Sequence, residues 1–112
     1  LRDEGSAIVA ITHDEAVVQR TAAALKAQLV GSKVIEVPPI TASEDFSEYG
    51  KAGVPSMFFF VGVSDPKAVA ESSKPGGKPV AFNHSPFFAP VPESIKMGVE
   101  AMTTAVLSTM NK

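Results

Sequence analysis

The spacing of apolar residues predicts alternating helical and extended segments along the chain. Four apolar residues recur at helical spacing ahead of Gly31, namely Val18, Ala22, Leu25 and Leu29. Because a glycine commonly follows a helix end, this pattern predicts a helix over residues 14–30. Thr12 and Glu15 stand three residues apart, as in a capping box, and Asp14 adds negative charge where the helix dipole favours it. One face of this helix should therefore lie in a core.

Three further runs predict strands. A β-branched run at residues 7–11 predicts a short one. Residues 34–37 predict another, which ends at Pro38 because proline has no backbone N–H to pair. Residues 54–62 are apolar on both alternating faces, which is typical of a central strand covered on both sides. Strands that alternate with helices predict an α/β fold, with helices packed on a mostly parallel or mixed sheet.

The remaining connections are marked by turn residues. Hydroxyls followed by acids at residues 41–46 predict the start of a short helix that Gly50 and Gly53 end. Residues 64–79 contain Asp-Pro, Ser-Ser and Pro-Gly-Gly, which predict a loop and the most mobile segment of the chain. Residues 80–82 predict one more short strand.

A final helix begins near Pro92, which suits a first turn. Four apolar residues recur within it at i, i+4, i+7 and i+11: Ile95, Val99, Met102 and Val106. This stripe predicts the helix face that packs on the sheet.

Composition narrows the class of protein. With 112 residues, 45% of them apolar, the chain suffices for one domain with a hydrophobic core. A net charge of −2 without a basic stripe argues against nucleic acid as a partner. The longest apolar run, residues 57–63, is far shorter than the roughly 20 residues of a membrane span, so no membrane segment is expected. The absence of cysteine excludes disulfides and thiolate ligands and leaves cytoplasm and periplasm both open.

The segment Asn83-His84-Ser85-Pro86 carries the main candidate for chemistry. It places one of the two histidines between a predicted strand and the last helix, where a ring nitrogen can serve as a metal ligand. From spacing alone, a loop histidine bonded to a carbonyl is favoured, because zinc needs three or four ligands and no neighbouring pair completes a site. His13 reads as an exposed residue at a helix entry and receives no role.

Two adjacent acids, Glu44 and Asp45, are the other candidates. They can act in acid–base chemistry or simply cap a helix, and their spacing leaves both readings open. Ser85 beside His84 forms no catalytic pair, since adjacent residues rarely share the required geometry, and no Gly-x-Ser-x-Gly elbow or phosphate-binding loop occurs.

Four motifs, taken together, resemble one family. In order along the chain they are Ala42-Ser43-Glu44-Asp45-Phe46-Ser47-x-Tyr49, Val54-Pro55-Ser56-x-Phe58-Phe59-Phe60-x-Gly62, Asn83-His84-Ser85-Pro86-x-Phe88 and Gly98-Val99. Their order and spacing are similar to the M20 metallopeptidase superfamily, in its amidohydrolase branch of hippurate and auxin-conjugate hydrolases. The likeness covers the chain from about Ile11 to its end.

The resemblance implies a zinc-exopeptidase catalytic domain, of which this chain is the last portion. Residues 1–11 would be the exit strand of an upstream lid domain, and residues 12–112 the C-terminal catalytic segment. The family's His-Ser-Pro histidine, a ligand of a two-metal centre of Zn, Mn or Co, corresponds to His84. The other ligands and a general-base glutamate would lie upstream, so the chain alone is expected to be inactive.

For the intact enzyme, the resemblance implies hydrolysis of small amides such as N-acyl amino acids by a metal-activated water. Ser43, Glu44 and Asp45 would lie near the substrate cleft, orienting groups that bind metal or substrate. A homodimer would form through the lid domain. Asn83 departs from the family pattern, where histidine or leucine is common, and this change should leave the metal role of His84 intact. Val91-Pro92 replaces a common acidic pair, so the polar contact that the pair makes in relatives is not expected to carry over, and the substrate preference can differ accordingly.

Two other classes of function compete with this one. A stand-alone α/β module that binds a ligand or partner without catalysis fits the compact length and the incomplete site. An oligomerisation domain fits less well, because residues 57–63 read as internal core rather than as an exposed apolar patch. Metal content of the complete protein separates the first alternative from an amidohydrolase.

Overall fold

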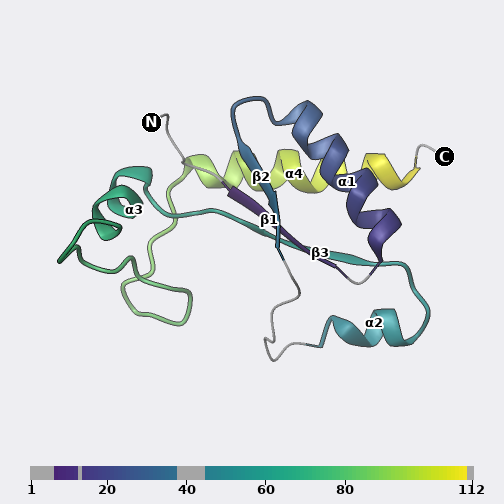
Figure 1. Ribbon diagram of the computed structural model, residues 1–112, viewed down its shortest axis with the longest axis horizontal. Coiled ribbons are helices and arrows are strands. Elements are labelled where there is room, and N and C mark those ends of the chain that lie inside the picture. Colours follow the sequence, from purple (N-terminus) through teal and green to yellow (C-terminus); the bar gives the residue numbers. More distant parts are fainter. Residues whose placement is uncertain (1–6, 13, 38–44, 111–112) are drawn as a thin grey trace.

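The structure is a computed structural model that describes residues 7–12, 14–37 and 45–110. Its elements, in chain order, are β1 (Ala7–Thr12), α1 (Glu15–Gln28), β2 (Lys33–Glu36), α2 (Ser47–Lys51), β3 (Met57–Val61), α3 (Pro66–Ser72) and α4 (Glu93–Met110) (Figure 1). No helix of the described ranges is long and apolar enough to cross a membrane.

The described strands form a mixed sheet in the order β2-β1-β3. β1 runs parallel to β2, with Ala7 opposite Lys33, and antiparallel to β3, with Thr12 opposite Met57. Helices and strands in one layered unit fit the expected α/β class. The assignment of residues 1–11 to an upstream lid stays a prediction; in this structure residues 7–12 pair with both neighbouring strands.

The prediction that residues 54–62 form a central strand is wrong for the described sheet. β3 is shorter, Met57–Val61, and lies at the edge, while β1 occupies the middle. An apolar pattern on both faces of a strand indicates that other parts of the protein pack on both faces of the sheet. It does not indicate whether another strand pairs with each edge of that strand. Side chains pack on both faces of β3. Met57 and Phe59 pack against the buried cluster of Leu25, Leu29 and Ala101. On the other face, the centroid of the Phe58 ring lies 5.3 Å from that of the Phe46 ring.

An aromatic group covers the second face of β3 at the sheet edge. The ring centroids of Phe58 and Phe60 are 5.0 Å apart in an edge-to-face arrangement, and those of Phe46 and Tyr49 are 5.5 Å apart. Such arrangements suit the opposite charges of ring faces and edges. Phe60 is still 42% exposed, so the expectation that residues 57–63 are wholly internal is also wrong.

α1 provides most of the buried residues among the side chains that the structure describes, and its predicted apolar face is confirmed. All four residues of the predicted stripe, Val18, Ala22, Leu25 and Leu29, are buried. The helix begins one residue later than predicted, because Asp14 rather than Thr12 is the cap. The Asp14 carboxylate accepts a hydrogen bond from the Val17 N–H at 3.0 Å. Thr12 is the last residue of β1 and belongs to the sheet.

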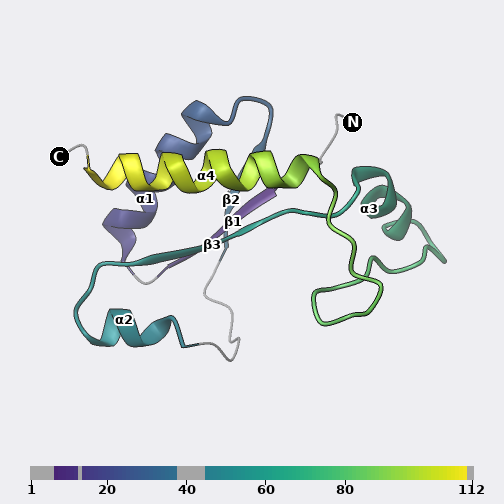
Figure 2. The ribbon, with the colours of Figure 1, turned by 180° about the vertical axis from the view of Figure 1, so that it is seen from behind.

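α4 packs with a different face from the predicted one. The stripe Ile95, Val99, Met102 and Val106 is 48–70% exposed. The buried residues of α4 are Ser94 and Ala101, and the Thr21 and Ser108 hydroxyls, from α1 and α4, lie 3.4 Å apart. Small side chains let two helices approach closely, so this face of α4 can lie against α1. Figure 2 shows α4 crossing α1 at an angle.

We call residues 64–90 the site loop; it leaves the end of β3 and returns before α4. Its base is closed by a hydrogen bond from the Val91 N–H to the Val63 carbonyl at 2.9 Å. The loop contains α3, which the sequence reading missed, and no strand at residues 80–82. The signal for α3 was present, since Asp65 caps it and Pro66 occupies its first turn.

Two glycines fix the turn that follows α3. Gly76 has a φ of +75°, which a residue with a Cβ rarely adopts. A Cβ on Gly77 would lie 2.1 Å from the Glu71 carbonyl oxygen, so no other residue fits there without moving backbone. The Pro-Gly-Gly segment therefore forms a defined turn.

Candidate metal-ligand site

His84 lies in the site loop between α3 and α4, and it is exposed. Its side chain makes no hydrogen bond or ion pair with the described residues. The carbonyl-bonded loop histidine that spacing alone favoured is therefore not observed within the described part of the chain. A neutral imidazole with accessible nitrogens can act as a metal ligand.

The backbone at His84 is unusual. Its φ is +74°, and among the described residues it is the one non-glycine with a positive φ. The left-handed region costs a residue with a Cβ roughly 1–3 kcal/mol, although histidine tolerates it better than most. Such a conformation persists only where surrounding contacts hold it, and it is often found at functional sites.

Two consecutive turns hold this conformation. The Ser85 N–H donates to the Phe82 carbonyl at 3.1 Å, which closes a four-residue turn with His84 in its third position. A positive φ at that position is the mark of a type II turn. The Phe88 N–H donates to the Ser85 carbonyl at 3.1 Å and closes a second turn, in which Pro86 takes the position it favours.

The acidic candidates lie elsewhere. Ser43 and Glu44 fall outside the described residues. Asp45 is exposed and lies two residues before the start of α2, and its carbonyl accepts a hydrogen bond from the Glu48 N–H at 3.0 Å. In both views α2 and the light-green part of the site loop lie at opposite ends of the molecule, whose longest dimension is 46 Å (Figures 1 and 2). The structure therefore does not bring Asp45 close to His84.

The described residues supply one fitting metal ligand and not a complete site. His84 has the donor chemistry and exposure that a divalent ion requires of a ligand. No group of three or more His, Cys, Asp or Glu side chains among the described ranges could hold a metal ion. A metal centre that includes His84 must draw its other ligands from outside these ranges.

By its fold and by this site, the protein is an α/β protein that presents the exposed imidazole of His84 from a turn with a left-handed backbone. The sequence profile of Peptidase family M20/M25/M40 matches residues 2–108, and the chain belongs to this family. That membership makes it a hydrolase of the metallopeptidase type, and the family generally binds divalent metals. Comparison with curated proteins and with solved structures gives no match.

Sequence reasoning dismissed Ser85 because adjacent residues do not form a nucleophile and base. In the structure its side chain has another task, since the Ser85 Oγ accepts a hydrogen bond from the Phe87 N–H at 3.2 Å. A serine that follows a histidine and precedes proline is a turn signal, and hydroxyls bonding the backbone two residues on are common in turns. That signal was available in the sequence.

Proposed function

We propose that this chain is the C-terminal catalytic segment of a metal-dependent amidohydrolase that cleaves N-acyl amino acids or related small amides. The observation that carries the proposal is the match of the family profile to residues 2–108, a range that includes the His-Ser-Pro segment at residues 84–86. The exposed imidazole of His84 supports it, because a ligand for a shared centre must be accessible.

In this function His84 contributes one neutral imidazole to a centre of two divalent ions, Zn, Mn or Co. The remaining ligands and the general-base glutamate would come from sequence that precedes Leu1. Divalent ions, when bound, supply polarisation of the amide carbonyl and activation of a water molecule. The chain alone would then be inactive.

Other parts of the proposal concern the complete enzyme. Residues 1–11 would leave a lid domain through which two copies associate, and residues 12–112 would complete the zinc-exopeptidase-like domain. Ser43, Glu44 and Asp45 would border the substrate cleft and orient groups around it. For Asp45 this requires a site assembled mainly by the preceding sequence, because α2 lies far from the site loop.

The test is His84→Ala in the complete protein, with His13→Ala as the matched control at the second histidine. Metal content and hydrolysis of N-acyl amino acids are measured with added Zn²⁺, Mn²⁺ or Co²⁺. We expect His84→Ala to lose about one metal ion per chain and at least ~100-fold in activity, since even groups that only support a ligand contribute 10- to 100-fold. His13→Ala should retain both.

Unchanged metal content and activity in His84→Ala would contradict the ligand assignment. A complete protein that binds no divalent ion would instead favour the non-catalytic binding module. Activity on longer peptides, with none on N-acyl amino acids, would retain the metallopeptidase and reject the amidohydrolase branch.

A further inference from the structure

We propose that Ser85 is a positioning residue, which holds the imidazole of His84 in its metal-binding direction by closing the turn that contains His84 and the turn that follows it. The inference rests on the proposed function, because it concerns how the ligand is oriented. It is carried by the backbone conformation of His84 and by the three hydrogen bonds of Ser85.

The N–H, the carbonyl and the side-chain oxygen of Ser85 each take part in a hydrogen bond within the site loop. Its N–H donates to the Phe82 carbonyl at 3.1 Å, its carbonyl accepts from the Phe88 N–H at 3.1 Å, and its Oγ accepts from the Phe87 N–H at 3.2 Å. The first bond closes the turn that contains His84, and the other two close the turn that follows. Ser85 therefore joins the two turns and restricts the backbone immediately after His84.

Packing does not supply this restriction. Residues 82–84, 86 and 87 are exposed, Phe82 by 80% and Phe87 by 82%, whereas Phe88, at 37%, is partly covered. An exposed residue at φ +74° would relax toward commoner conformations unless something held it. In the described structure the hydrogen bonds of the two turns are the contacts that do so.

A fixed backbone at His84 matters because metal binding depends on the direction of the ligand. Groups that orient a ligand typically affect metal affinity 10- to 100-fold when removed. Here the orienting contacts act on the backbone of the ligand residue. Two of the three hydrogen bonds of Ser85 are made by its backbone. A substitution can remove the third, which the Oγ accepts from the Phe87 N–H.

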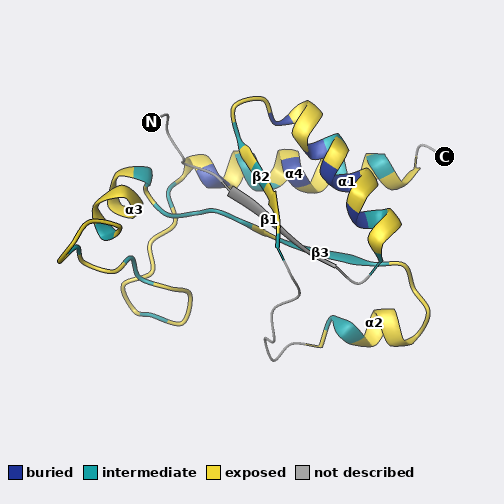
Figure 3. Cartoon of the chain, in the orientation of Figure 1, coloured by how far each residue is buried: buried dark blue, intermediate teal, exposed yellow. Residues whose placement is uncertain are grey.

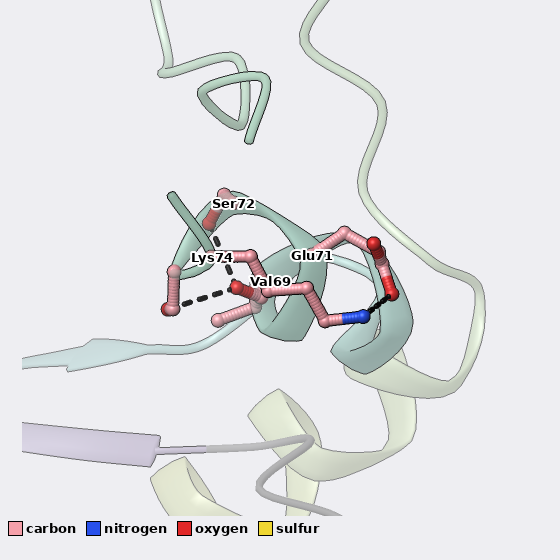
Figure 4. Close-up of polar contacts among 5 residues, drawn as sticks. Val69, Glu71, Ser72 and Lys74 are labelled. Atoms are coloured by element: carbon pink, nitrogen blue, oxygen red, sulfur yellow. Dashed lines mark hydrogen bonds and ion pairs between the residues drawn. The ribbon is translucent and has the colours of Figure 1, made fainter. Parts of the chain in front are cut away.

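The experiment compares Ser85→Ala with Ser85→Thr in the complete protein, which keeps the hydroxyl. Ser72→Ala is the matched control, because the Ser72 hydroxyl also bonds backbone in the site loop, to the Val69 carbonyl at 2.7 Å (Figure 4). Zn²⁺ dissociation constants are measured by chelator competition, and the Co²⁺ absorption spectrum reports ligand geometry. We expect Ser85→Ala to weaken one ion about 10- to 100-fold and alter the spectrum. Ser85→Thr and Ser72→Ala should stay within about threefold of the unmodified protein.

Metal affinity and a Co²⁺ spectrum of Ser85→Ala equal to the unmodified protein would overturn the positioning role, and so would equal losses in Ser85→Ala and Ser85→Thr. If His84→Ala loses metal in the same assay, the proposed function stands without the positioning role. A complete protein that binds no divalent ion overturns both. If Ser85→Ala does not fold, Pro86→Ala loosens the second turn without touching the hydroxyl; it must also weaken Zn²⁺ binding, and unchanged affinity would reject the proposal.

Discussion

The helical core, formed by α1 and α4, and the site loop differ in what holds them in place. Every buried residue of the described side chains belongs to α1, the residue that ends it, or α4. None of residues 45–93, all of which the structure describes, is buried. Figure 3 shows this contrast, with dark blue confined to α1, the segment just after it, and α4.

The difference separates stability from function in this chain. The helical core buries apolar side chains, which is the main source of folding free energy. The site loop retains its shape through turns, caps and the hydrogen bond at its base. Such a loop can open without unfolding the core, as is common where functional residues lie on connections carried by a rigid scaffold.

The largest effect should come from matched valines in the two regions. Val18 on α1 is 1% exposed, whereas Val69 on α3 is 39% exposed. Val18→Ala removes buried methyl groups and leaves a cavity, so we expect a loss of about 2–3 kcal/mol in the free energy of unfolding. Val69→Ala should change it by no more than ~0.5 kcal/mol. Urea unfolding of both variants checks this, and equal losses would remove the distinction between the regions.

A smaller effect is expected at two matched helix caps. The Asp14 carboxylate accepts from the Val17 N–H and the Asp65 carboxylate from the Lys67 N–H, each at 3.0 Å. Asp14→Ala should cost about 1 kcal/mol of global stability, because α1 belongs to the core. Asp65→Ala should leave the urea midpoint unchanged and speed amide exchange within α3. A global loss in Asp65→Ala would show that the site loop unfolds together with the core.

The smallest effect concerns the ion pair that joins Lys74 to Glu71 in the site loop (Figure 4). Both side chains are more than 60% exposed, so water and salt screen the pair. Glu71→Gln should change the free energy of unfolding by less than ~0.5 kcal/mol and leave metal affinity unaltered. Thermal unfolding at low and high salt is the measurement. A larger, salt-sensitive loss would mean that this pair couples the loop to the core.

The sequence by itself determined features that depend on near neighbours along the chain. The stripe of α1 repeats every three to four residues, and its burial follows from helix geometry alone. The order of short motifs identified the family, and with it His84 as a candidate ligand. Asp65 and Pro66 are also a signal for the start of a helix, although Asp-Pro was interpreted as a turn and α3 was not predicted.

Only the tertiary structure decided features that depend on distant partners. The periodicity of α4 predicts burial of a large apolar stripe, but a face with small residues meets α1 instead. The four stripe residues remain exposed: Ile95, Val99, Met102 and Val106. The apolar pattern of β3 could not reveal its place in the sheet, because order is set by backbone pairing with β1. The identity of a residue does not fix its φ angle. The left-handed backbone of His84 depends on the hydrogen-bonded turns formed by its neighbours.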